Sequence, residues 1–222
     1  MASESDNTDL VPASDPKQLA LDVASFVASA VPYIGGPVSN VLSGVATTRK
    51  LNRVRGLLER VAADLKEFKT EATERYVKTE EFEELLERTL RQAADERSEE
   101  KRRIYASFLR DDIKTPGGTY DDKVRFLRTL EQLQPDHLMV LKALGEAPEA
   151  NPGTMGSPSQ TLSKRLPGMN AVHIAELVAQ LNDMRVTNLS SLKVIMTGRG
   201  AADLRHSVTE YGRRFLGYLL EA

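Results

Sequence analysis

Apolar residues between positions 51 and 68 recur at alternating steps of three and four residues. This spacing places them on one stripe of a helix, as in helices that pack against another helix. The small-residue segment before them runs into this pattern, so we expect one long helix over about residues 38–70. The stripe is predicted to pack against another helix or to mediate self-association, and it consists of Leu51, Val54, Leu58, Val61, Leu65 and Phe68.

A second long helix is predicted over about residues 79–115, followed by a short helix over residues 122–134. The middle of the long helix, residues 95–103, is a run of charges that we interpret as a solvated helix face. Within it Glu99 and Arg103 have the i,i+4 spacing of an ion pair on a helix surface. Residues 17–134 are therefore expected to form a helical region of long helices.

The N-terminal part of the chain has a different composition. Residues 1–16 are polar and acidic and are expected to be disordered. Residues 19–48 are rich in Ala, Ser, Gly and Val, and a break at Pro32 and Gly35-Gly36-Pro37 leaves two pieces, each shorter than the ~20 residues of a membrane span. We interpret this segment as a helical hairpin within a bundle. Conditional membrane insertion and an oligomer interface are the alternatives, the first with a positive flank of Arg49, Lys50, Arg53 and Arg55.

The pattern changes at residue 135. A helix over residues 136–145 is followed by a loop rich in Pro, Gly and Asn. Ser157 and Gln160 then have the spacing of a capping box, which predicts the start of a short helix. Asn170 is placed to cap a third helix, which continues to about residue 185.

Two strands and a last helix are predicted to follow. Residues 191–197 and 204–208 resemble strands on either side of a tight turn at Gly198-Arg199-Gly200, and Thr209 is the predicted cap of the final helix. Gly212 lies early in that helix, where glycine costs about 1 kcal/mol relative to alanine. We therefore expect Gly212 to allow a close approach to the hairpin. The buried stripe of this helix is predicted to be Tyr211, Phe215, Tyr218 and Leu219.

Three helices, a β-hairpin and a closing helix have the order of a winged helix-turn-helix. The sequence Val208-Thr209-x-x-Gly212-Arg213 resembles the ending of MarR-like and PadR-like winged-helix proteins. The fold class is therefore expected to be mainly α, a helical bundle followed by a small α+β winged helix-turn-helix domain over residues 135–222. The alternative is an irregular helical lobe with a hairpin. The resemblance implies that the third helix enters a DNA major groove and that Arg199 lies at the wing tip.

The charges of this region do not favour DNA. Residues 135–222 contain nine Lys or Arg and eight Asp or Glu, a net charge of +1, and duplex affinity depends heavily on phosphate neutralisation. We therefore expect the module to bind a protein partner, with a DNA-binding transcriptional regulator as the alternative. The candidate binding residues are the small cationic patch and the exposed face of the third helix: Lys164, Arg165, His173, Glu176, Gln180, Arg199 and Arg205.

Composition narrows the function classes further. The 222 residues contain no cysteine, carry a net charge of −2 and have a pI near 6.0. The three histidines fall in separate elements, and no phosphate loop, dinucleotide fingerprint or serine nucleophile motif is present. We therefore expect no enzymatic activity, no cofactor and no metal site. Acidic residues near the start, including Glu4 and Asp6, have the wrong charge for a secretory signal, so a cytoplasmic location is expected.

The helical region also has a family likeness. The patterns "EEFEELLERTL", "SEEKRRIYASFL" and "FLRTLEQLQPDHLMVLKAL" resemble those of helical bacterial proteins that include the Abi-alpha (abortive infection) family. This resemblance implies a role in phage defence or stress response. The leading hypothesis is an interaction protein, a defence effector that self-associates through its heptad helices. The second is a winged-helix regulator, and the third is a membrane-active effector that uses residues 19–48.

Overall fold

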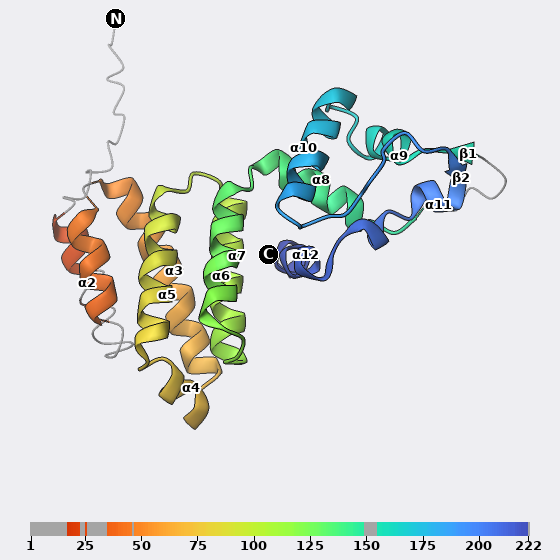
Figure 1. The fold of residues 1–222 in the computed structure, drawn as a ribbon. Coiled ribbons are helices and arrows are strands. Elements are labelled where there is room, and N and C mark those ends of the chain that lie inside the picture. Colours follow the sequence, from red (N-terminus) through yellow and green to blue (C-terminus); the bar gives the residue numbers. More distant parts are fainter. Residues whose placement is uncertain (1–16, 23–24, 26–34, 46, 149–154, 222) are drawn as a thin grey trace, which may run out of the picture.

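The computed structural model describes residues 17–22, 25, 35–45, 47–148 and 155–221. The protein is mainly helical, with a helical bundle followed by a small region that adds two short strands to its helices (Figure 1). The predicted fold class is confirmed at this level. The predicted acidic tail, residues 1–16, lies outside the described residues.

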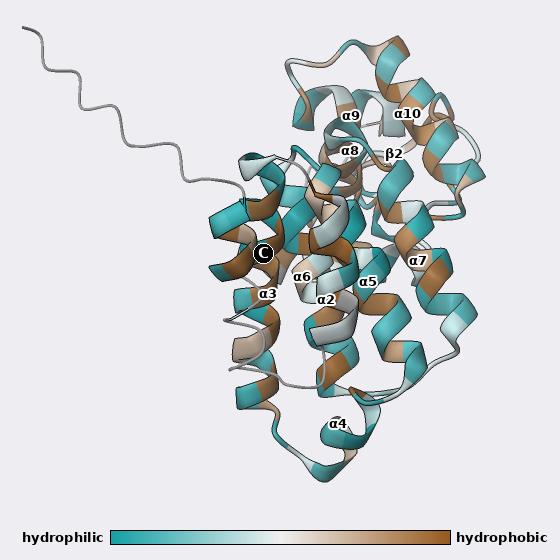
Figure 2. Ribbon diagram, turned by 90° about the vertical axis from the view of Figure 1, so that its left-hand side faces the viewer, coloured by the Kyte–Doolittle hydropathy of each residue, from teal (hydrophilic) through white to brown (hydrophobic). Residues whose placement is uncertain are grey.

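The bundle places helices side by side (Figures 1 and 2), and many of their apolar side chains are buried in the core. α3 packs against α5 and α6, while α2 and α7 both pack against α5. Figure 2 shows brown and teal alternating along α5 and α7, as expected for amphipathic helices. The elements are α2 (Gly35–Gly44), α3 (Thr48–Glu67), α4 (Glu71–Tyr76), α5 (Glu80–Asp95), α6 (Glu99–Lys114) and α7 (Tyr120–Gln132).

The heptad stripe of α3 lies inside this bundle. Leu51, Val54, Leu58 and Val61 are at most 1% exposed, and Leu65 packs half-buried at the edge of the core, as does Phe68. The stripe therefore contacts other helices of the same chain. Self-association through these side chains would require the bundle to open.

Each of the two predicted long helices is divided in the structure. The helix expected over residues 38–70 is interrupted between α2 and α3, where Thr47 has an extended backbone. The helix expected over residues 79–115 is interrupted between α5 and α6, within the charged run. There Glu96 is extended, and the Ser98 side chain accepts a hydrogen bond from the Lys101 backbone N–H, which starts a new helix. A side chain that caps a new helix competes with continuation of the preceding helix. The spacing of apolar residues carries no information about such caps, so it does not predict the break at Ser98.

The charged run is more than a solvated face. The predicted pair of Glu99 and Arg103 is present, with 2.7 Å between nitrogen and oxygen. Lys101, however, is buried and forms an ion pair of 2.7 Å with Glu96 at the break. The run therefore contains a helix boundary fixed by a partly buried ion pair.

One ion cluster is buried between α4, α5, α6 and α7. The ammonium of Lys123, only 5% exposed, lies 2.9 Å from Asp112 and 2.8 Å from Glu81, and it donates a hydrogen bond to the Tyr76 hydroxyl. Burial alone would lower the pKa of Lys123, but hydrogen bonds with Glu81, Tyr76 and Asp112 outweigh it and raise that pKa. The cation therefore stays charged inside the bundle because each neighbour accepts from it.

The small-residue segment 19–48 is described only in part, since residues 23–24 and 26–34 lie outside the described residues. Its second half is α2, which begins at Gly35 and includes Pro37 in its first turn, a position where proline is tolerated. Val38 and Val41 of α2 are buried in the core. Among the described helices, none has the length and apolar character needed to cross a membrane.

Two predicted helix caps are present in the C-terminal region. The capping box of Ser157 and Gln160 is present, and Asn170 caps α10 by accepting from the Val172 N–H. The elements are α8 (Pro135–Gly145), β1 (Met155–Gly156), α9 (Pro158–Arg165), α10 (Ala171–Asp183), β2 (Met196–Thr197), α11 (Gly198–Ala202), the 3-10 turn η2 (Arg205–Ser207) and α12 (Glu210–Glu221).

The predicted hairpin is wrong in its pairing. β2 pairs antiparallel with β1, and not with the chain that follows it. The predicted turn is the short helix α11, because the Thr197 hydroxyl accepts from the Gly200 N–H and caps it. The predicted return strand is reduced to η2 and a single bridge between Val208 and Thr187. Arg199 consequently lies on α11 and not at the tip of a wing.

α12 is anchored by the two residues predicted to matter at its start. Thr209 caps the helix by accepting from the Gly212 N–H, and its hydroxyl donates to the carbonyl oxygen of Val186. A Cβ atom on Gly212 would lie 2.0 Å from that same carbonyl oxygen. The close approach that requires glycine is therefore to the chain after α10, and the predicted approach to a hairpin is wrong.

The buried side of α12 docks onto the bundle. Phe215 stacks on Phe126 of α7 with 4.0 Å between ring centroids. The Tyr218 hydroxyl lies 2.9 Å from an Asp111 carboxylate oxygen, and the Tyr211 hydroxyl lies 2.9 Å from that of Thr129. The last helix thus connects the C-terminal region to the bundle, and Figure 1 shows it between the two.

Candidate functional site

The cations predicted to bind a partner differ in their exposure and in the groups they contact. Arg165 is 10% exposed, and its guanidinium donates to the carbonyl oxygens of Ala143, Ala147 and Ala202 while its Nε lies 3.2 Å from Glu146. It ties α9 to the end of α8 and to α11. Arg165 therefore holds the domain together and has little surface left for a ligand.

The remaining predicted cations are exposed. Arg205 forms a two-pronged pair with Asp203, with distances of 2.9 and 3.0 Å, so its charge is compensated locally. Lys164 on α9 and Arg199 on α11 have exposed side chains. Of the four-member cationic patch, only these two present an uncompensated charge to solvent.

His173 and Glu176 lie together on the outer side of α10. The Nε2 of His173 is 3.0 Å from an Asp136 oxygen, and its Nδ1 is 3.7 Å from Glu176. The hydrogen bond with Asp136 is the main reason that the pKa of His173 is raised. Asp136 was absent from the predicted set, and it gives this surface an acidic rim.

Gln180 has a structural contact that the sequence did not indicate. Its Oε1 lies 2.7 Å from Nε2 of His137, a buried residue of α8. The Nδ1 of His137 accepts from the backbone N–H of Gln134, so the neutral ring with its proton on Nε2 satisfies both contacts. Burial lowers the pKa of His137. Gln180 therefore pins α10 to α8.

A groove of about 660 Å³ opens beside this pair of helices, between the start of α8 and the turn that joins α9 to α10. Its walls combine apolar and polar groups. Met139 is 47% exposed, and Val172, on the adjoining outer face of α10, is 66% exposed. The lining side chains include Asp136, Met139, Leu166, Pro167, Met169 and His173.

The sequence contained a signal for Met139 that the predicted set did not use. The helix of residues 136–145 is apolar on nearly every side, so one of its large side chains has to face outward. Val172 similarly falls outside the buried face of its helix. Both are exposed apolar residues next to the predicted polar candidates.

A second apolar group surrounds the strands. Met155, Val194 and Ile195 are each at least 48% exposed, and Ile195 reaches 72%. Isolated exposed apolar side chains are normal. Here six large ones, these three with Met139, Val172 and Leu220, belong to the C-terminal region, whereas no large apolar side chain from α3 to α7 is as exposed.

In the part of the chain that the structure describes, no three His, Asp or Glu side chains gather in a way that could hold a metal ion. The polar groups of the groove also lack a nucleophile paired with a base. The lining of the groove combines apolar side chains such as Met139 with the carboxylate of Asp136.

Comparison of the chain with family models, with curated proteins and with solved structures finds no match. The resemblances to MarR-like, PadR-like and Abi-alpha proteins accordingly remain interpretations of the sequence pattern. The geometry of the chain itself has to support any functional conclusion.

Proposed function

We propose that this chain is a non-enzymatic interaction protein whose C-terminal region binds a protein partner through the groove between α8 and the α9–α10 turn. The observation that supports this proposal is the concentration of exposed apolar side chains on that region, with Met139 and Val172 beside the groove. Partially exposed apolar residues rimmed by polar groups are typical of protein-binding surfaces.

The charges around the groove indicate the partner's chemistry. Asp136 and Glu176 are more than half exposed, and His173 links them. An apolar segment that carries a Lys or Arg would place its side chains on Met139 and Val172 and its charge against these carboxylates. Electrostatic complementarity of this kind contributes specificity and association rate.

The alternative, a DNA-binding regulator, is less well supported. Arg165 is tied to backbone carbonyls and Arg205 to Asp203, which leaves Lys164 and Arg199 of the predicted patch. With two phosphate contacts, the logarithm of the DNA-binding constant would fall with the logarithm of the salt concentration with a slope of about −1.8, from ~0.9 per neutralised phosphate. Such a module would bind duplex DNA weakly at physiological salt.

The proposal is tested by quantitative affinity purification with the full chain as bait. We expect specific partners to be lost with Met139→Asp and Val172→Asp and weakened with Glu176→Lys, because these changes alter the groove and its rim. Lys66→Ala, an exposed change on α3, is the matched control and should retain the partners. Equal recovery with all variants, or tight sequence-selective binding to duplex DNA at ~150 mM salt, would contradict the proposal.

The resemblance to Abi-alpha proteins extends this proposal to a role in phage defence or stress response. A membrane-active role would require Val38, Val41 and Leu42 of the segment 19–48 to leave the core in which they are buried. Self-association likewise would need a surface other than the stripe on α3. The groove remains the surface that the described residues favour.

A further inference from the structure

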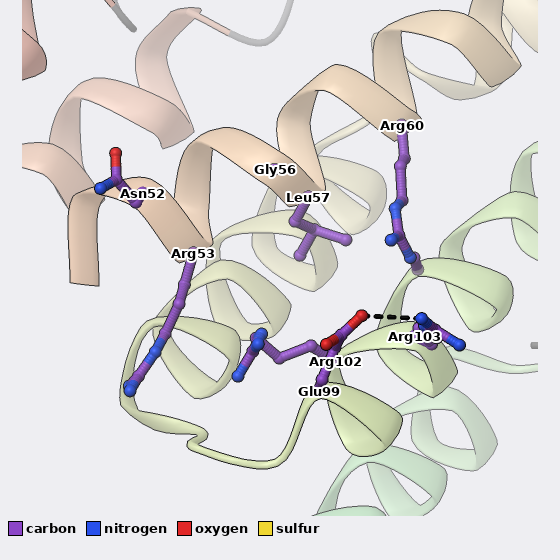
Figure 3. A pocket seen from close by; sticks show the side chains of 9 residues that line it. Asn52, Arg53, Gly56, Leu57, Arg60, Glu99, Arg102 and Arg103 are labelled. Atoms are coloured by element: carbon purple, nitrogen blue, oxygen red, sulfur yellow. Dashed lines mark hydrogen bonds and ion pairs between the residues drawn. The ribbon is translucent and has the colours of Figure 1, made fainter. Parts of the chain in front are cut away.

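Four arginines line one cavity between α3 and α6 of the bundle. Arg53 and Arg60 come from α3, and Arg102 and Arg103 come from α6. The cavity measures about 300 Å³, within the size range of small-molecule sites. Figure 3 shows Arg60 extending from α3 toward α6, Arg53 reaching the end of α5, and Arg102 reaching across the space below Leu57.

The cavity carries an excess of positive charge. Among its lining residues, four guanidinium groups face one carboxylate, that of Glu99, which lies 2.7 Å from Arg103. Asp95, at the nearby end of α5, pairs its carboxylate with Lys50. Arg60 interacts electrostatically with Asp64 of the same helix, whose carboxylate also lies 3.7 Å from Arg110. The lining therefore has a net charge of +3.

Two of these arginines are held in place without losing their charge. Arg53 donates to the carbonyl oxygens of Ala94 and Asp95, and Arg102 donates to those of Glu96 and Arg97. A carbonyl oxygen orients a guanidinium but does not neutralise it. Each of these arginines hydrogen-bonds to the carbonyls through one of its two terminal nitrogens. This is preorganisation of the kind that favours anion binding.

Gly56 provides the space. It lies in the interior of the 20-residue helix α3, where glycine is unfavourable. A Cβ atom at this position would meet no atom within 4 Å, so packing against a neighbour does not explain the glycine. Gly56 lines the cavity together with the buried side chains of Leu57 and Ala106. Its absent side chain keeps the floor of the cavity open.

From these observations we infer that the cavity between α3 and α6 binds a small phosphorylated molecule. Arginine presents a planar fork of donors that matches phosphate oxygens, and several arginines together suit a ligand with more than one negative charge. The apolar floor adds a surface on which a base or another flat group would lie. The inference does not depend on the proposed function of the C-terminal groove.

Titration calorimetry of the full chain tests the inference with inorganic phosphate, pyrophosphate, the common nucleotides and a short single-stranded oligonucleotide as probes. We expect one phosphorylated small molecule to bind with one site per chain and a Kd below about 1 mM. Stronger binding of a nucleotide than of pyrophosphate would identify a nucleoside phosphate. Equal binding of the two would identify the phosphate groups alone as the ligand.

Two variants distinguish this site from general attraction to positive charge. Arg60→Ala should weaken binding at least about tenfold, since it removes one charge-assisted contact. Gly56→Leu should abolish binding while it retains every arginine, because the new side chain fills the cavity. Lys66→Ala removes a cation from the same helix outside the cavity and should change binding less than about twofold.

Three results would overturn the inference. The first is no binding of any small phosphorylated probe at concentrations up to about 10 mM. The second is binding of the oligonucleotide alone, with an affinity that grows with length, which would indicate a nucleic-acid backbone surface. The third is an equal loss of binding with Arg60→Ala and Lys66→Ala. Circular dichroism of each variant is the control that checks whether the bundle is folded.

Discussion

The bundle and the C-terminal region differ in where they place their large apolar side chains and in how their most buried cations are held. From α3 to α7, large apolar residues are buried, and the two cations buried with them pair with carboxylates, Lys101 with Glu96 and Lys123 with Asp112 and Glu81. In the C-terminal region, the most enclosed arginine, Arg165, is held largely by backbone carbonyls, and large apolar residues such as Ile195 reach the surface.

This difference separates stability from binding. In the bundle the apolar side chains are buried between the helices, where they stabilise the fold. A small region that leaves apolar side chains exposed has surface available for another molecule. We therefore infer that the bundle supplies the main stability of the chain, and we propose that the C-terminal groove binds a partner.

The largest expected effect comes from breaking the buried ion cluster. Lys123→Met leaves Asp112 and Glu81 without their cation and should lower the free energy of unfolding by about 3–5 kcal/mol, as for other broken buried pairs. Urea unfolding at neutral pH measures it. Lys142→Met removes the cation of a half-exposed pair with Glu100 and should cost no more than about 1 kcal/mol. Similar losses from both variants would contradict the contrast between buried and exposed pairs.

The junction of the two regions is tested by its glycines. Gly212→Ala should destabilise the chain by about 1–3 kcal/mol, because the new methyl group overlaps the Val186 carbonyl oxygen. Gly217 lies in the same helix with open space around it, so Gly217→Ala should stabilise by about 1 kcal/mol. Thermal unfolding compares the two. Effects of the same sign would show that α12 does not approach Val186 as described.

The pH dependence of stability is expected to have opposite contributions from two histidines. Burial lowers the pKa of His137, so the stability that this residue contributes is lost as pH falls below its unfolded value of about 6.5. The hydrogen bond with Asp136 raises the pKa of His173, so its contribution is present below that value and is lost as pH rises through the folded pKa.

Urea unfolding between about pH 5.5 and pH 8 measures both contributions. His137→Gln should reduce the loss of stability on the acid side, whereas His173→Gln should increase it. The readout is the change with pH and not the stability at one pH. A pH profile that both variants shift in the same direction would contradict the two environments described for these rings.

The smallest expected effect on stability comes from the exposed apolar residues. Val172→Ser and Ile195→Ser should each change the free energy of unfolding by less than about 0.5 kcal/mol, as for surface substitutions. Leu90→Ala, in the bundle core, should cost about 2–5 kcal/mol. A loss above 1 kcal/mol for either serine variant would mean that these side chains are packed, and the contrast between the regions would fail.

Apolar periodicity predicted the helical bundle because its helices are amphipathic over several turns. The stripe on α3, the cap at Ser157 and the need for glycine at position 212 all followed from local rules. The breaks between α2 and α3 and between α5 and α6 did not. The interruption at Ser98 depends on the cap that its side chain forms and on the ion pair of Lys101 with Glu96. These are contacts between polar side chains, and the spacing of apolar residues does not predict them.

The candidate site was predictable only in part. The polar residues of α10 could be placed on one face, but their partners could not, since His173 meets Asp136 and Gln180 meets His137 across a separation of about forty residues. The predicted hairpin failed because only Met196 and Thr197 of its first strand form β2, and β2 pairs with β1, which precedes α9. Arginines 53 and 102 lie even farther apart in sequence, so the cavity that they line has no local signal.

Site-specific photo-cross-linking at position 172 tests the central claim most directly. A cross-linking amino acid is placed there in the full chain, and the same residue is placed at position 59 on the exposed side of α3 as the control. In cells that naturally produce the protein, we expect one discrete protein adduct from position 172, lost with Met139→Asp, and none of that mass from position 59. The same adducts from both positions, or none from position 172 alongside tight duplex DNA binding, would contradict a partner-binding groove in the C-terminal region.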